Sequence, residues 1–310
     1  LIRESVRDKL VNAGLNETIS YSVANYSDLL LTGDDLEENR VVRLQNPMDT
    51  TRDCLRNSIR ANVLETACNN RKLDQQSGIK IFEIGNTFTF SSENSENKLP
   101  DEKENMVAIL TGPRVDFSIW SGPVDDFDFF DAKGVVESAL NFRLNDLSFE
   151  KFHSGIFRNS LSAEIKIGSY RVGIMGLLNQ QICERYELND SPVYLIELDL
   201  EQIYKLGFVD SQRYVTTSKY PSSSRDIALI SPINTTSSSI KSIILKNRLV
   251  LDTFPIDVFD EPKSESVTKA ITYRVIFQSD NQTLSTEDID KAQNQILKSL
   301  EHQLSTVSRY

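Results

Sequence analysis

Residues 79–90 read IKIFEIGNTFTF, a segment dominated by Ile, Phe and Thr, with Gly85 and Asn86 at its centre. β-Branched and aromatic residues favour extended backbone, and a Gly-Asn pair is typical of a tight turn between antiparallel strands. The pattern therefore predicts a strand, a turn at Gly85 and Asn86, and a second strand. Residues 106–111 (MVAILT) predict a further short strand.

Helical and extended patterns alternate on both sides of this segment. Apolar residues recur at helical spacing from Ile2 to Ala13, and Gly14 follows, which predicts a helix over 2–13 capped by glycine. The other predicted elements of this half are strands at 17–23 and 40–44, a helix at 55–71, a hairpin at 163–178, a helix at 180–186 and a strand at 193–198. This alternation predicts an α+β domain with a mostly antiparallel sheet.

The last third of the chain has a different and shorter pattern. Its predicted elements are strands at 225–230, 256–260 and 270–278 and helices at 239–248 and 286–304, in the order β-α-β-β-α. That order is typical of the ferredoxin-like fold. A length of 310 residues suits two domains, and we expect them at 1–212 and 218–310.

The composition is that of a soluble globular protein, with no apolar run long enough to span a membrane. The net charge of −11 falls on residues 1–218, because the remainder carries 11 basic and 11 acidic residues. A nucleic-acid partner is therefore expected at the neutral C-terminal part. Three cysteines without Cys-x-x-Cys spacing predict neither disulfides nor zinc and suit the cytoplasm. The opening at Leu1 predicts a piece of a longer protein.

Motifs for catalysis are missing from the sequence, with no phosphate-binding glycine loop, nucleophile elbow or zinc-protease motif. An acidic cluster contains carboxylates of the kind that hard cations bind, at Asp125, Asp126, Asp128 and Asp131. Because a helical pattern follows, a helix with a negatively charged first turn is favoured over a metal site. His153 in a Ser/Gly turn could act as an acid or base, but a structural loop role is favoured.

Seven short phrases occur in a fixed order along the chain. They are NPMDTTRDCLRNS (46–58), IFEIGNTF (81–88), DFFDAKG (128–134), VGIMGLL (172–178), YPSSSRDIA (220–228), DVFD (257–260) and IFQSDNQTL (276–284). Together they resemble the C-terminal part of the beta subunit of bacterial phenylalanine-tRNA ligase. The sequence departs from that family at 153–158 (HSGIFR), where the family has a tighter H-P-G-R phrase, so the role of this loop stays open.

The resemblance implies a class II synthetase fold that has lost its chemistry. In catalytic class II enzymes an Arg after the I-G-x-x-F phrase contacts an ATP phosphate, and a Glu follows two residues later. Thr89 and Ser91 occupy these positions here. The resemblance therefore implies a non-catalytic domain with a large apolar surface, including the helix at 2–13, against the catalytic alpha subunit in an (αβ)₂ heterotetramer. No cofactor is expected in this chain, whereas ATP and Mg²⁺ serve the whole enzyme.

For the C-terminal domain, the resemblance implies a platform for the anticodon loop of tRNA(Phe). Asp260 matches a family carboxylate that accepts hydrogen bonds from guanine at the first anticodon position. Ala228 would let a base lie against the sheet, and Arg225 would meet a phosphate or stack on a base. Capping of the turn at Glu261 and Pro262 is the alternative role for Asp260. The alternative function for the chain is a stand-alone tRNA-binding or synthetase-like paralogue.

Overall fold

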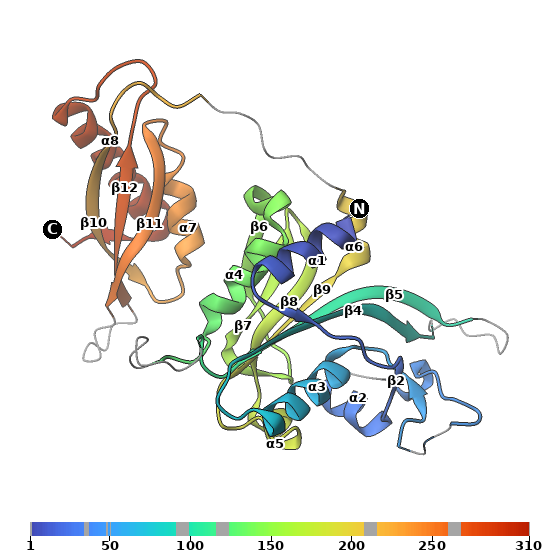
Figure 1. Ribbon diagram of the computed structural model, residues 1–310. Coiled ribbons are helices and arrows are strands. Elements are labelled where there is room, and N and C mark those ends of the chain that lie inside the picture. The colour runs from blue at the N-terminus through green and yellow to red at the C-terminus, as the bar shows by residue number, and fades with distance from the viewer. Residues whose placement is uncertain are drawn as a thin grey trace. The chain divides into compact units, whose positions relative to one another are not determined.

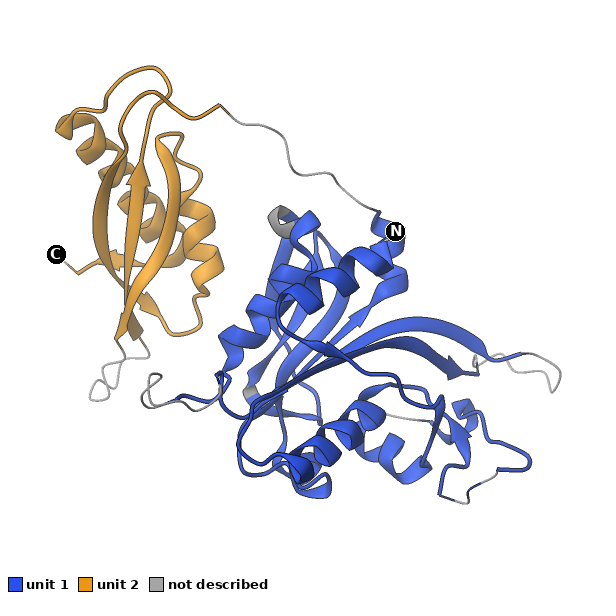
Figure 2. Cartoon of the chain, viewed as in Figure 1, with its two compact units in different colours: residues 1–212 blue, residues 213–310 orange. Residues whose placement is uncertain are grey.

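The computed structural model describes residues 2–33, 37–47, 49, 51–90, 99–115, 124–207, 216–259 and 268–309. The chain divides into two compact units, Leu1–Gln212 and Arg213–Tyr310 (Figure 2). Each unit has its own sheet and its own apolar core. No helix within the described ranges is long and apolar enough to cross a membrane.

The first unit is built on a seven-stranded sheet in the order β1-β4-β5-β9-β8-β7-β6 (Figure 1). Its strands are β1 (Asn16–Glu17), β4 (Ile79–Thr89), β5 (Asp101–Thr111), β6 (Leu147–Lys151), β7 (Phe157–Ile167), β8 (Tyr170–Leu178) and β9 (Val193–Asp199). Every neighbouring pair is antiparallel except β1 with β4. The sheet is therefore mostly antiparallel, as the sequence predicted.

The segment at 79–90 forms one long strand rather than a hairpin. β4 stays paired with β5 along its whole length, so the turn predicted at Gly85 and Asn86 is wrong. Glycine is needed there for another reason, because a Cβ on Gly85 would lie 2.3 Å from Nη2 of Arg56. Gly85 thus makes room for a buried guanidinium instead of bending the chain.

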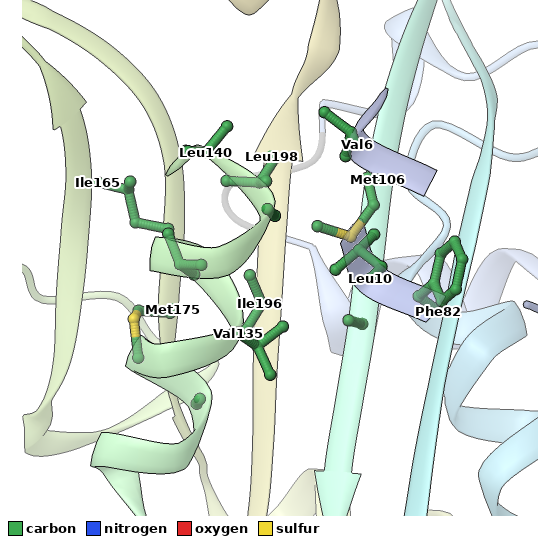
Figure 3. Close-up of a cluster of buried hydrophobic side chains, with 14 of the residues drawn as sticks. Val6, Leu10, Phe82, Met106, Val135, Leu140, Ile165, Met175, Ile196 and Leu198 are labelled. Carbon is green, nitrogen blue, oxygen red and sulfur yellow. The ribbon is translucent and has the colours of Figure 1, made fainter. Parts of the chain in front are cut away.

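Helices cover both faces of this sheet (Figure 1). On one face lie α1 (Ile2–Asn12), α4 (Phe129–Ala139) and α6 (Leu200–Leu206), and on the other lie α3 (Arg60–Leu73) and α5 (Gln180–Arg185). Figure 3 shows the first core, in which Leu10 of α1 and Val135 of α4 meet side chains of the sheet. Along β4, Phe82 belongs to this core and Ile81 to the second, because successive side chains of a strand alternate between faces.

Neither of the two strands predicted near the N-terminus forms as expected. The predicted strand at 17–23 is reduced to β1 and β2 (Val23–Ala24), and between them Ile19 and Tyr21 are 92% and 76% exposed. Residues 40–44 form no strand; they follow the 3-10 helix η1 (Glu38–Arg40) and make a single bridge, from Arg43 to Cys54. β-Forming residues became strand here only where a partner strand lay beside them.

The helix predicted at 55–71 begins later than expected. β3 (Cys54–Leu55) pairs with β2, so α3 starts only at Arg60. A short helix, α2 (Tyr26–Thr32), packs against α3 through the small core that contains Leu29 and Ala61. The hairpin predicted at 163–178 is confirmed as β7 and β8, and η2 (Asn141–Asp146) precedes β6.

The second unit has the β-α-β-β-α order predicted from the sequence. Its elements are β10 (Ser223–Pro232), α7 (Ser237–Ile244), β11 (Val250–Phe259), β12 (Thr268–Phe277), α8 (Thr286–Leu304) and an added short strand, β13 (Val307–Ser308). The sheet runs β11-β12-β10-β13 with every pair antiparallel. A capping box of Ser285 and Asp288 starts α8, which packs with α7 around Ile227, Tyr273 and Ile296.

Candidate nucleic-acid interface

The four-stranded sheet of the second unit has described helices on one face only (Figure 1). Odd-numbered residues of β10 and β12, such as Ile227 and Tyr273, are buried against α7 and α8. Because side chains alternate along a strand, the even-numbered residues of these strands lie on the opposite face. We call this the open face.

A row of four residues crosses the open face. Asp257 of β11 lies opposite Thr272 of β12, which lies opposite Ala228 of β10. The backbone N–H of Arg309 donates to the carbonyl oxygen of Ala228 at 2.9 Å, which places Arg309 next along the row. Directly opposed residues of antiparallel strands share a face, and the methyl group of Ala228 leaves space for a flat ring above the sheet. We call these four residues the Ala228 row.

Beside the Ala228 row lies an ion pair with an aromatic neighbour. Arg274 of β12 donates two hydrogen bonds to the carboxylate of Asp226, at 2.8 and 2.7 Å. These hydrogen bonds hold the pKa of Asp226 below its ordinary value. Phe254 of β11 lies opposite Arg274 and is 40% exposed, and Phe259, at the end of β11, is 51% exposed. The open face therefore offers aromatic rings, a guanidinium and carboxylates together.

The structure separates two of the predicted site residues. Arg225 and Ala228 are three positions apart in a strand of unbroken register, so they point to opposite faces of β10. Arg225 lies opposite Val275, at the start of the strand and on the helix-covered side. Asp260 lies outside the described residues. Of the three, only Ala228 is placed on the open face by the described structure.

Sequence reasoning did not single out Asp257 and Arg309 as site residues. Asp257 begins the DVFD phrase, but without a register its position opposite Thr272 could not be known. Arg309 joins the row only because the chain returns after α8 as an edge strand beside β10. The signal that the sequence did offer is the alternation along β10. Ile227 and Leu229 are buried, so Ala228 between them lies on the other face of the strand.

The first unit contains the other positions that the sequence pointed to. Thr89, which the resemblance matched to the phosphate-binding arginine of class II enzymes, ends β4 half-buried, and Ser91 lies outside the described residues. His153 is exposed in the loop between β6 and β7. Thr89 brings a hydroxyl, and no guanidinium, to its position.

The acidic cluster at 125–131 organises a helix terminus. Asp128 and Asp131 form a capping box at the start of α4, as the favoured interpretation predicted. Arg114 pairs with both carboxylates, at 2.5 Å and 2.7 Å. In the part of the chain that the structure describes, no group of three or more His, Cys, Asp or Glu residues could hold a metal ion.

In this chain a ferredoxin-like sheet with an open face follows a unit built on a large, mostly antiparallel sheet. The family model for the ferredoxin-fold anticodon binding domain matches residues 218–309. The model for the phenylalanyl tRNA synthetase beta chain CLM domain matches residues 1–200. The chain belongs to the phenylalanyl-tRNA synthetase beta chain family.

Named relatives agree with this membership. The phenylalanine-tRNA ligase beta subunit of Bacillus licheniformis is 30% identical over 311 residues, and that of Dehalococcoides mccartyi is 28% identical over 308 residues. Each match covers 99% of this chain and 37% of the relative, so the chain spans little more than a third of their length. The crystal structure of pyrrolysyl-tRNA synthetase from Desulfitobacterium hafniense has a TM-score of 0.50 at 14% identity, over 69% of this chain and 72% of that one, which shows a shared fold.

Proposed function

We propose that this chain works within a phenylalanine-tRNA ligase, where it supports the catalytic alpha subunit and binds the anticodon of tRNA(Phe). In this proposal, residues 1–212 are a class II catalytic-like domain without an active site, and residues 218–310 are the anticodon-binding domain. The observation that carries it is the open face with its Ala228 row, inside the region that matches the anticodon-binding family model. The work would take place in the cytoplasm, where tRNA is charged.

The side chains of the open face are of the kinds on which RNA bases stack. Single-stranded bases bind by stacking on aromatic rings and guanidinium planes, which contributes about 1–3 kcal/mol per base. Phe254, Phe259 and Arg274 supply such groups on or beside the open face, and Ala228 leaves room between them. Since this part of the chain is electrically neutral, stacking and base-edge hydrogen bonds would contribute more than phosphate attraction.

We propose that Asp260 recognises the base. Asp257, which is among the described residues, is the alternative candidate for this role. An ionised carboxylate can accept both the N1–H and the N2–H of a guanine edge. Asp257 already lies in the Ala228 row, on β11, and Thr272 of β12 lies between it and Ala228. Replacing the true reader with Ala should cost about 1–3 kcal/mol of tRNA binding and relax the preference for guanine.

The test is aminoacylation by the reconstituted alpha and beta subunits, with wild-type tRNA(Phe) and a variant at the first anticodon position. Asp260→Ala should reduce discrimination between the two tRNAs, whereas Asp257→Ala should reduce it only if Asp257 is the reader. If both variants keep the wild-type discrimination, base reading by this strand is excluded and a turn-capping role for Asp260 takes its place.

The two arginines should behave differently from the carboxylates. Arg225 lies on the helix-covered side at the start of β10, and Arg309 lies beside Ala228. Each is proposed to meet a phosphate, so Arg225→Ala and Arg309→Ala should weaken binding of both tRNAs equally. A change in base preference in either variant would contradict a phosphate role.

The alpha subunit is proposed to contact the first unit at the outer side of α1, in an (αβ)₂ assembly. Val6 and Leu10 face the core, so the outer side carries Glu4, Asp8 and the half-exposed Val11. Asp8→Lys combined with Val11→Glu should reduce co-elution with the alpha subunit in size-exclusion chromatography. Unchanged co-elution would move the contact to another surface.

The first unit is proposed to lack catalysis. Thr89 cannot supply the fork of donors that stabilises a phosphoryl transition state. ATP and Mg²⁺ would therefore act in the alpha subunit, and this chain alone should give no phenylalanine-dependent exchange of pyrophosphate into ATP. Exchange by a preparation free of alpha subunit would refute the proposal.

A further inference from the structure

The three long strands of the second sheet bring a single cation to the open face. Among the described residues of β10, β11 and β12, Arg274 is the only Lys or Arg at an open-face position. β11 contains neither residue type, and Arg225 and Lys269 occupy positions on the helix-covered side. Arg274 lies between Phe254 of β11 and Asp226 of β10. Of the groups on these strands, it is therefore the one that would attract a phosphate.

Asp226 neutralises this guanidinium. The Nε and Nη2 atoms of Arg274 donate hydrogen bonds to the two carboxylate oxygens of Asp226, at 2.8 and 2.7 Å. A bidentate pair of this kind fixes the plane of the guanidinium, and its two opposite charges cancel at a distance. Arg274 keeps the N–H groups that Asp226 does not use, and it keeps a flat surface for stacking. The pair therefore favours contacts with bases and opposes contacts with phosphates.

The fold has little need of this ion pair. The side chains of Arg274 and Asp226 are 44% and 43% exposed. Ion pairs with this exposure contribute little to stability, because water screens them. β10 and β12 also stay in register along the whole of both strands, and Ile227 and Tyr273 anchor them to the core beneath. A role in binding explains the pair better than a role in folding does.

A neutralised guanidinium has a specific advantage on a platform for RNA. Every RNA offers phosphates, whereas base edges differ from one RNA to another. An unpaired guanidinium would strengthen the binding of all RNAs without improving discrimination between them. Specificity often requires a group that weakens binding of the wrong partner. A carboxylate beside the guanidinium does this, since it cancels the attraction for phosphate.

We propose that Asp226 is a specificity-determining residue, an inference that rests on the proposed binding of tRNA at the open face. Asp226 holds Arg274 in a neutral pair and so prevents this face from binding the phosphates of unrelated RNA. Arg274 meets the cognate RNA through its stacking surface and its remaining N–H groups. Asp226 acts through Arg274 and is separate from the carboxylate that recognises guanine.

The test compares two RNAs by fluorescence anisotropy, with the reconstituted alpha and beta subunits at a series of salt concentrations. The RNAs are tRNA(Phe) and a short oligouridylate, whose bases have no amino group for a carboxylate to recognise. Asp226→Asn removes the charge but keeps an oxygen that accepts a hydrogen bond from Arg274. This variant should bind oligouridylate about threefold to tenfold more tightly at low salt, and the slope of log affinity against log salt should steepen by about 0.7. The preference for tRNA(Phe) over oligouridylate should fall.

Two further variants show whether the gain comes from Arg274. Asp226→Asn combined with Arg274→Gln should bind oligouridylate like the wild type. Asp290→Asn is the matched control, because it removes the same charge from an exposed aspartate of α8, on the helix-covered side. It should leave the affinity unchanged, and the thermal midpoints of all variants should verify folding. The role of Asp226 is overturned by no gain in Asp226→Asn, or by an equal gain in the double variant or the control.

Ala228→Trp separates this role from the proposed function. An indole above the sheet should block the open face and weaken the binding of both RNAs by about tenfold or more, because bases lose their stacking surface. If it does so and Asp226→Asn gives no gain, only the role of Asp226 is overturned. If Ala228→Trp leaves the binding of both RNAs unchanged, RNA does not bind at the open face. That result would overturn both the proposed function and the role of Asp226.

Discussion

The two sheets of this protein obey the same alternation rule with opposite consequences. The seven-stranded sheet is covered on both faces, so neighbouring residues such as Ile81 and Phe82 are both buried. The four-stranded sheet is covered on one face, so Ile227 is buried whereas Ala228 is not. Polar groups in the first sheet must therefore form hydrogen bonds inside the protein. Polar groups on the open face of the second sheet remain accessible to solvent or to a ligand.

Arg56 tests the first half of this comparison. It is 3% exposed and donates to Glu83, which is 2% exposed, and to the hydroxyl of Ser20. Arg56→Ala leaves a buried carboxylate unpaired and should destabilise the first unit by about 3–5 kcal/mol in urea denaturation. Arg52→Ala, which breaks the exposed pair with Glu65, should cost about 1 kcal/mol or less. Similar costs for the two variants would contradict the difference between buried and exposed pairs.

Substitutions at two isoleucines of β10 allow a direct comparison of the two faces of the second sheet. Ile227 is 2% exposed in the core, whereas Ile230 lies half-buried on the open face. Ile227→Ala should cost about 2–5 kcal/mol, because it removes buried apolar area and leaves a cavity. Ile230→Ala should cost clearly less. Thermal denaturation of both variants measures the difference, and equal losses would mean that the open face is covered.

The stability change caused by Gly85→Ala would show how tightly the first sheet is packed around this position. A Cβ at this position would overlap Arg56, so Gly85→Ala should destabilise by about 1–3 kcal/mol. Gly134 in α4 has no atom within 4 Å of an added Cβ. Gly134→Ala should therefore stabilise the protein by about 0.5–1 kcal/mol, since alanine favours a helix over glycine. Denaturation curves of both variants decide, and stabilisation by Gly85→Ala would refute the close approach.

The smallest effect concerns the ion pair on the open face. Arg274 lowers the pKa of Asp226, so this pair contributes stability above the unfolded carboxyl pKa and loses it as the pH falls through the lower folded pKa. NMR titration should give Asp226 a pKa below the ordinary aspartate value. Arg274→Gln should return it towards that value. An unchanged pKa in the variant would assign the shift to another group.

Part of the site could be predicted from the sequence, and part could not. Ala228 was found by resemblance, and its place on the open face follows from its apolar neighbours Ile227 and Leu229. The separation of Arg225 from Ala228 follows from strand period, which the resemblance alone does not use. Arg309 required the third dimension, because only the pairing of β13 with β10 brings it there.

The sequence by itself determined the features that depend on nearby residues. The helix α8, with its cap at Ser285 and its stripe of Ile289, Ile296 and Leu300, begins and ends where the pattern predicted. Tertiary structure alone decided which residues that are distant in the sequence come into contact. Gly85 has the sequence of a turn, yet it lies within a strand, because β5 pairs with β4 on both sides of it and Arg56 occupies the space that a side chain would need. Local propensity is worth fractions of a kcal/mol per residue, roughly, and long-range pairing and burial outweigh it.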